Sequence, residues 1–175
     1  MKTAGVLALA LAAGAATPGG TVAQPVPAPA ILFDCADRAW SVKLLAPDSG
    51  SLVLITSPND RAEAIGNVTA SWDDVRKGHV VGQGGGHQSH IRLFDGVRSF
   101  ILFEGEDGAL ADQPGRTYAG VVTITQSAPD QDFQIDCPAT QTNARLVASV
   151  AEWSARVGAK PPRGEDEGGP FDGWF

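Results

Sequence analysis

Apolar and polar residues alternate along the middle of the chain, which is the pattern of β-strands with one buried face. WSVKLL and SLVLIT are two such runs separated by the turn residues APDSG, so we expect a hairpin between them. RTYAGVVTIT and DFQIDC are typical strands further along, and DFQIDC places Phe133, Ile135 and Cys137 on one face. Between these segments, SWDDVRKG predicts one or two helical turns, because Ser71 can cap the N-terminus and Gly78 follows the last basic residue.

The segment HIRLFDGVRSFILFE predicts a second hairpin in which Asp95 and Gly96 form a two-residue turn. In that register Phe94 pairs with Val97, and His87 lies opposite Glu104. Both faces of this hairpin are apolar: one carries Ile91, Leu93, Phe100 and Leu102, and the other carries Phe94, Val97, Ile101 and Phe103. Such a strand pair has to lie inside a sandwich or be covered by a helix.

The C-terminal part has a helical period instead. Leu146, Val150, Trp153 and Val157 predict an amphipathic helix over residues 143–158 that packs on the β-core. Residues 159–175 form an acidic, glycine-rich tail that ends in three aromatic residues, Phe171, Trp174 and Phe175. We expect this aromatic end to pack on its own domain, and the alternative is a docking peptide for a partner.

The N-terminal part predicts export. Lys2 precedes a short apolar run and small residues lie at the cleavage position, so residues 1–23 are expected to be a signal peptide. Residues 24–32 then form a proline-rich linker. The run is too short to span a bilayer, and no cysteine follows it to carry a lipid, so we expect a soluble periplasmic or secreted product without a membrane span in the mature chain.

The cysteines and the charge narrow the class of protein further. The chain has two cysteines, Cys35 and Cys137, which we expect to form a disulfide in an oxidising compartment and to close a β-domain over residues 33–140. Its formal net charge is −7, so nucleic acid is not an expected partner. The predicted fold is an antiparallel β-sandwich or small barrel with a C-terminal amphipathic helix.

The glycine-rich segment VGQGGGHQSH is the first candidate for a functional site. It has neither the lysine of a phosphate-binding P-loop nor the third glycine of a dinucleotide-binding turn. Glycine loops expose backbone donors, and histidines supply polar groups whose charge changes near neutral pH. We therefore expect an unknown protein or small ligand of the cell envelope to bind around Gly84, Gly85, Gly86, His87, Ser89, His90 and Glu104.

A metal site is the alternative interpretation of the same segment. His79, His87 and His90 could bind zinc or copper with help from a carboxylate. Residues three apart in a strand point to opposite faces, so His87 and His90 converge only if the glycines bend the backbone. A His87–Glu104 cross-strand pair is the simpler expectation.

Catalytic motifs are not evident in the sequence. Ser89 is not in a nucleophile elbow, and the carboxylates Glu104, Glu106 and Asp107 are typical of a solvated turn. We expect a binding or envelope-associated domain without catalysis.

Four segments carry a resemblance to known proteins: CADRAWSV, HIRLFDGVRSFILFEGEDG, YAGVVTIT and FQIDC. Over residues 33–137 the chain resembles small exported bacterial β-proteins of uncharacterised function that have one disulfide between the first and last strands. More distantly it is similar to the periplasmic inhibitors of C-type lysozyme, which implies lysozyme inhibition as another possible function. Those inhibitors carry an S-G-x-x-Y loop, and the nearest segment here, DGVRSF, lacks the Ser-Gly order and the tyrosine.

Overall fold

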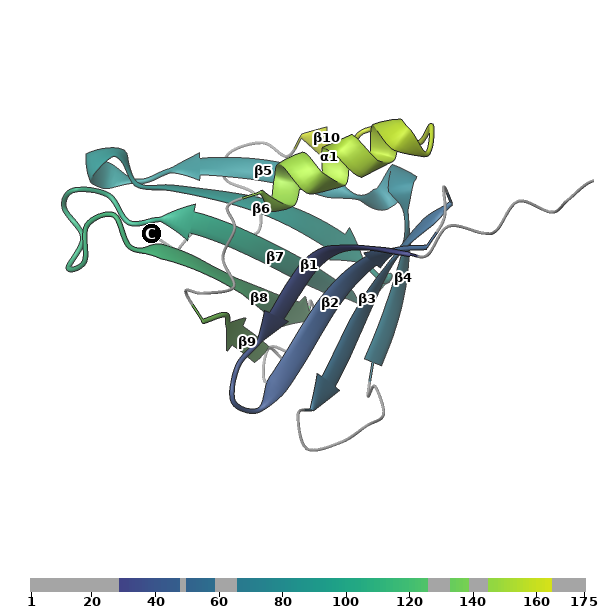
Figure 1. Cartoon of the computed structure of the whole chain (residues 1–175), viewed down its shortest axis with the longest axis horizontal. Helices are drawn as coiled ribbons and strands as arrows, with labels where there is room; N and C mark the ends of the chain where they lie inside the picture. Colours follow the sequence, from purple (N-terminus) through teal and green to yellow (C-terminus); the bar gives the residue numbers. More distant parts are fainter. Residues whose placement is uncertain (1–28, 48–49, 59–65, 126–132, 139–144, 165–175) are drawn as a thin grey trace, which may run out of the picture.

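The computed structural model describes residues 29–47, 50–58, 66–125, 133–138 and 145–164. Within these ranges the chain forms two mainly antiparallel sheets and one α-helix (Figure 1). This confirms the predicted class, a mainly β-fold with a helix near the C-terminus. The expected signal peptide, most of the proline-rich linker and the aromatic end of the tail lie outside the described residues.

The first sheet contains four strands in sequence order, each antiparallel to the next. They are β1 (Ala30–Ala36), β2 (Trp40–Ala46), β3 (Ser51–Pro58) and β4 (Gly66–Ser71). The predicted hairpin of WSVKLL and SLVLIT is therefore confirmed as β2 and β3. Because β1 begins at Ala30, the last residues of the predicted linker belong to the first strand.

The second sheet contains six strands in the order β10-β5-β6-β7-β8-β9. They are β5 (Arg76–Val81), β6 (His87–Phe94), β7 (Arg98–Glu106), β8 (Thr117–Thr125), β9 (Phe133–Asp136) and β10 (Arg163–Gly164). Neighbouring strands are antiparallel except β10, which runs parallel to β5. The sequence pattern did not predict β10, which lies within the expected tail.

A 3₁₀ helix, η1 (Trp72–Asp74), connects the two sheets. Ser71 caps it as predicted, because its Oγ accepts a hydrogen bond from the N–H of Asp73. The helix is shorter than the expected one or two turns, since the chain enters β5 at Arg76 and pairs with β6. Trp72 is buried at this corner.

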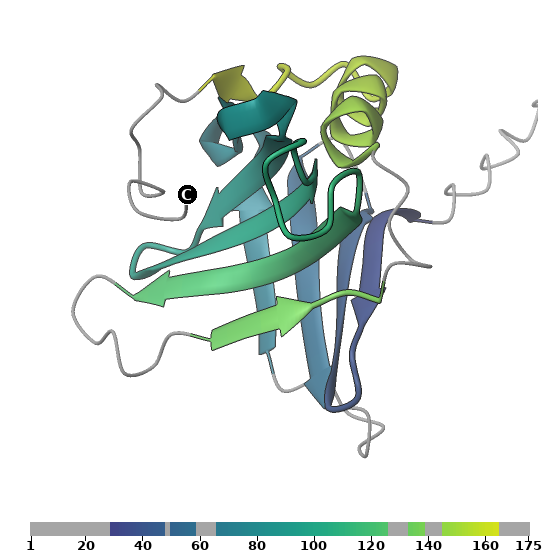
Figure 2. The ribbon, with the colours of Figure 1, turned by 90° about the vertical axis from the view of Figure 1, so that its left-hand side faces the viewer.

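The main core lies between the two sheets (Figure 2). The first sheet contributes Leu44 and Leu54, and the inner face of the second contributes Ile91, Leu102 and Val121, all almost completely buried. The disulfide between Cys35 and Cys137 is confirmed, and it ties β1 to the end of β9 with a Cα–Cα distance of 5.2 Å. The sheets are thus joined by apolar packing and by a covalent link at one edge.

Helix α1 (Leu146–Arg156) completes this core. It lies along the top of the molecule in Figure 1, in contact with β6 and β1, and buries Leu146 and Val150 between them. Trp153 and Val157 are partly buried against the core, as their helical spacing predicted. Among the described residues, no helix is long and apolar enough to cross a membrane.

The hairpin of β6 and β7 is confirmed, but the predicted two-residue turn is wrong. Phe94 pairs with Ser99 instead of Val97, because Oδ1 of Asp95 accepts hydrogen bonds from the N–H groups of Val97 and Arg98 and holds a longer loop. Gly96 adopts a φ of 96° within this loop. Each cross-strand partner is shifted by two residues, so the side chains within the two strands keep their predicted faces. Val97, which was expected on the face of Phe94, lies instead in the loop and is exposed.

Candidate functional site

The candidate binding residues are divided between the two faces of the second sheet. Residues directly opposite in neighbouring strands share a face. His79 lies opposite Ser89, which lies opposite Glu104, and this row belongs to the inner face together with Ile91 and Leu102. His90 lies opposite Gly78 and Phe103, so it belongs to the outer face. The glycines do not bend the strand enough to bring His87 and His90 to one point.

Two of the three histidines do come together. The ring centroids of His79 and His87 are 5.9 Å apart, and Nδ1 of His79 lies 3.0 Å from Oγ of Ser89. The described part of the chain holds no group of three or more His, Cys, Asp or Glu side chains that could bind a metal ion. The three-histidine arrangement proposed from the sequence is therefore not assembled.

Glu104 has a structural partner that the sequence did not indicate. It lies opposite Ser89, whereas His87 lies opposite Glu106, so the expected His87–Glu104 pair is wrong. Its Oε1 accepts a hydrogen bond of 2.6 Å from the N–H of Leu146 at the start of α1, where Arg145 supplies no side-chain cap. Burial raises the pKa of the Glu104 carboxyl, and the N–H groups of Leu146 and Arg145 offset part of that rise. Glu104 holds the helix on the sheet.

The glycine loop is used largely for close backbone packing. It includes the 3₁₀ segment η2 (Gln83–Gly85), in which Gly84 has a φ of 70°. The N–H of Gly82 donates to the carbonyl of Gly86, and the carbonyl of Gly84 accepts from the N–H of Ala109. A Cβ at Gly84 or Gly86 would meet the backbone of residues 108–110. These glycines let two loops approach each other at the end of the sheet.

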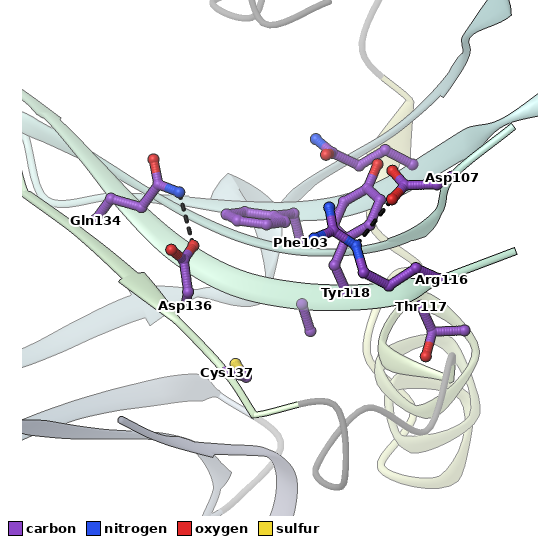
Figure 3. Close-up of a pocket in the computed structure, with 10 residues that line it drawn as sticks. Phe103, Asp107, Arg116, Thr117, Tyr118, Gln134, Asp136 and Cys137 are labelled. Carbon is purple, nitrogen blue, oxygen red and sulfur yellow. Dashed lines mark hydrogen bonds and ion pairs between the residues drawn. The ribbon is translucent and has the colours of Figure 1, made fainter. Parts of the chain in front are cut away.

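A pocket of about 750 Å³ lies on the other side of the sheet, over the outer face of β7, β8 and β9. Figure 3 shows Phe103 and Tyr118 at its centre, Gln134 and Asp136 on one side, and Asp107 and Arg116 on the other. The remaining lining residues are Gln88, Thr117, Ala119 and Cys137.

Glycines in the sheet allow the rings of this face to lie flat. Three cross-strand pairs join a ring to a glycine directly opposite: His90 with Gly78, Phe103 with Gly120, and Tyr118 with Gly105. A Cβ on any of these glycines would collide with the ring opposite it. The floor of the pocket is thus built from aromatic rings lying on bare backbone, a device that also fixes strand register.

The polar groups of the pocket differ in how they are bound. Nε2 of Gln134 donates to Oδ1 of Asp136 at 2.7 Å, and Nε of Arg116 lies 2.8 Å from Oδ2 of Asp107. Gln88 is only 3% exposed, and its Nε2 has no hydrogen-bond partner among the described residues. Burial, reinforced by the charge of Asp107, raises the pKa of the Tyr118 phenol, although Arg116 opposes this. At neutral pH the Tyr118 hydroxyl is a hydrogen-bond donor.

A second hollow of about 550 Å³ adjoins the first, and both are lined by Asp107 and Tyr118. It brings in two of the predicted residues, Gly86 and His87, together with the exposed side chains of Val81 and Leu110. The predicted glycine–histidine face therefore borders the pocket, while Glu104 does not contribute to either hollow.

The sequence pattern did not indicate the centre of the pocket, namely Phe103, Tyr118, Gln134 and Asp136. The available signal was the set of glycines inside strand-like runs, in EGE and YAG, because a glycine in a strand often marks close approach of another group. That signal locates the pocket only if the register between neighbouring strands is known, because the register decides which ring lies opposite each glycine. Comparison with family models, curated proteins and solved structures finds no match for this chain.

Proposed function

We propose that this chain is an exported, disulfide-closed β-domain that binds a small ligand in the pocket on the outer face of its second sheet. The observation that carries the proposal is the buried amide of Gln88, whose nitrogen lacks a partner among the described residues beside the rings of the floor. A buried amide without a partner costs free energy, and a ligand acceptor would recover it.

The pocket favours a ligand with hydroxyl groups and an apolar face. Its volume falls within the usual range for small-molecule sites, and it combines a few polar groups with aromatic surface. The carboxylate of Asp136 accepts hydrogen bonds, the amide of Gln88 donates them, and the Tyr118 hydroxyl can donate to a ligand oxygen. A hydroxyl group both donates and accepts, so a sugar fits this set, with one ring face on the half-buried Tyr118. We propose a neutral saccharide of the cell envelope.

Export is part of the same proposal. The charged and apolar start of the chain supports it, because this is the composition of a secretory signal. The Cys35–Cys137 disulfide is compatible with an oxidising compartment such as the periplasm or the exterior.

Titration with neutral mono-, di- and trisaccharides, followed by protein NMR, tests the binding site. We expect saturable shifts at Gln88, Tyr118 and Gln134. Gln88→Leu keeps an apolar filling and removes the amide, so it should weaken binding by about tenfold. Tyr118→Phe removes one hydroxyl and should weaken it by roughly fivefold.

The matched control is Asp34→Asn, a half-exposed residue paired with Lys43 on the first sheet. This variant should bind the saccharide with the affinity of the unaltered chain. Absence of saturable shifts with every saccharide, or equal affinity of Gln88→Leu and the unaltered chain, would contradict the proposal.

A further inference from the structure

The second hollow continues the pocket past the ring of Tyr118. The two spaces share Tyr118 and Asp107, and each has a volume within the usual range for small-molecule sites. The Tyr118 ring reaches from β8 over Gly105 of β7, because a Cβ at Gly105 would collide with its Cζ and hydroxyl oxygen. The same Cβ would collide with the carbonyl oxygen of His87 on β6. One aromatic ring therefore forms the border between the pocket and the second hollow.

The second hollow is lined by exposed aliphatic side chains. Four large apolar side chains are exposed in the described part of the chain, and two of them line this space. They are Val81, at the end of β5, and Leu110, in the loop after β7, which are 66% and 74% exposed. Covering such side chains with an apolar group removes their surface from water and lowers the free energy. The second hollow therefore favours a ligand group that ends in a methyl or a similar apolar group.

Hydrogen-bond acceptors and donors line the same space. Arg116 binds Oδ2 of Asp107, which leaves Oδ1 to accept a hydrogen bond. The exposed carboxylate of Glu106 is a second acceptor, and His87 lies opposite it in the sheet and supplies a ring N–H. The Tyr118 hydroxyl is a further donor at the border. A ligand group in the second hollow can thus both donate and accept.

An acetamido group matches the aliphatic and the polar lining together. Its N–H donates to a carboxylate oxygen, its carbonyl oxygen accepts from a hydroxyl or an imidazole N–H, and its methyl group covers aliphatic surface. A plain hydroxyl group makes the hydrogen bonds but leaves Val81 and Leu110 in water. An ammonium group suits the carboxylates but neither accepts a hydrogen bond nor covers the aliphatic side chains.

We propose that the ligand is a saccharide of at least two units, with one unit in the pocket and an N-acetylated unit in the second hollow. This inference rests on the proposed function and specifies the ligand of the same site. The first unit contacts Gln88 and Asp136, the linkage passes over Tyr118, and the acetyl methyl group of the second unit lies against Leu110. Figure 3 shows Tyr118 beside Asp107 and Arg116, on the side of the pocket away from Gln134.

Two disaccharides with the same linkage test the proposal: N,N′-diacetylchitobiose, which carries an acetamido group on each unit, and cellobiose, which carries hydroxyl groups instead. Calorimetry on the full chain should show about tenfold tighter binding of the acetylated disaccharide, because it gains a hydrogen bond and a buried methyl group. NMR should show nuclear Overhauser effects between an acetyl methyl group and the methyl groups of Leu110.

Leu110→Ser should remove most of the preference for the acetylated disaccharide and leave the affinity for cellobiose unchanged. The side chain of Leu110 is exposed, so this variant should fold as the unaltered chain does. The matched control is Ile31→Ser, which replaces an exposed aliphatic side chain on the first sheet and should change neither affinity.

Equal affinity for the two disaccharides would overturn the N-acetyl assignment and leave saccharide binding in the pocket intact. A preference that persists in Leu110→Ser, or the absence of contacts to Leu110 in the unaltered chain, would also overturn it, because the acetyl group would then lie outside the second hollow. Absence of binding by both disaccharides and by every other saccharide would contradict the proposed function itself, and this inference with it.

Discussion

The two faces of β7 use neighbouring residues for different purposes. On the inner face, Phe100 and Leu102 pack against the first sheet and lie among aliphatic side chains from three other strands of their own sheet. On the outer face, Phe103 lies on a glycine of the next strand and forms the floor of a pocket. Alternation along one strand therefore gives the sheet one face that packs in the main core and one face that carries the pocket.

The strongest test of this difference compares adjacent residues that are both fully buried, Leu102 and Ile101. Leu102→Ala opens a cavity between the sheets and should lower the free energy of unfolding by about 2–5 kcal/mol. Ile101→Ala should cost less, because Ile101 belongs to a smaller apolar cluster on the outer face, with fewer buried neighbours than the main core. Denaturant unfolding with the disulfide intact measures both. Equal losses of unfolding free energy from Ile101→Ala and Leu102→Ala would show that the two faces do not differ in this way.

A smaller effect is expected at Glu104, which lies on the inner face beneath α1. Glu104→Ala leaves the N–H of Leu146 without its acceptor and should cost about 1–3 kcal/mol. Glu104→Gln keeps an acceptor oxygen and should cost less. Amide hydrogen exchange at Leu146 reports the loss locally, and exchange in β2 serves as the control.

The pH dependence of the free energy of unfolding distinguishes the Glu104 variants from the unaltered chain. The pKa of Glu104 is higher in the folded chain than its ordinary value of 4.5. The stabilisation that Glu104 contributes is therefore fully present at pH values below its unfolded pKa of about 4.5, and it is lost as the pH rises through the higher pKa of the folded chain. Glu104→Gln should remove this loss, and unfolding curves measured upward from pH 4.5 check it. An identical pH profile in Glu104→Gln and the unaltered chain would contradict the assignment.

The smallest effect is expected at the hairpin tip, which belongs to neither face. Partial burial raises the pKa of Asp95, but hydrogen bonds from the N–H groups of Arg98 and Val97 and from the Arg98 side chain hold it below 3.8 overall. Asp95→Ala should cost about 1 kcal/mol, and Asp95→Asn less, because asparagine keeps the acceptor oxygen.

The sign of the acid effect is opposite to that of Glu104. The contribution of Asp95 is present above the unfolded pKa and is lost as the pH falls through the folded one. Unfolding curves below pH 4 should therefore converge for Asp95→Asn and the unaltered chain. A constant difference between them down to the lowest pH would show that the carboxylate is not responsible.

Much of the fold could be predicted because it depends on local patterns. Alternation located β2, β3 and β6 to β9 but not β1, β4, β5 or β10. Helical spacing located Leu146 and Val150, and the two cysteines had one possible intramolecular partner each. The register of β6 and β7 could not be derived in this way, because the two hydrogen bonds to Asp95 lengthen the turn beyond the common Asp-Gly form.

The candidate site was harder to predict because its contacts are not local. Glu104 contacts Leu146, which is 42 residues away, and no periodic pattern records that pairing. The floor of the pocket depends on which glycine lies opposite which ring, and a register shifted by two residues assigns the wrong partners. His87, which lines the smaller hollow, could be named as a candidate binding residue from the sequence, because glycine content alone is enough to recognise its loop.

The Cys35–Cys137 disulfide can form only late in synthesis, after most of the β-domain has been made. The strands of each sheet follow one another in the sequence up to β9, so both sheets can begin to form as the chain emerges. Cys35 is separated from Cys137 by 102 positions and remains a thiol until nearly the whole β-domain has been made. Throughout that interval it is open to mixed disulfides with other thiols. A chain interrupted before Cys137 would carry a reactive cysteine and could be trapped by a thiol oxidoreductase, whereas the completed chain could not.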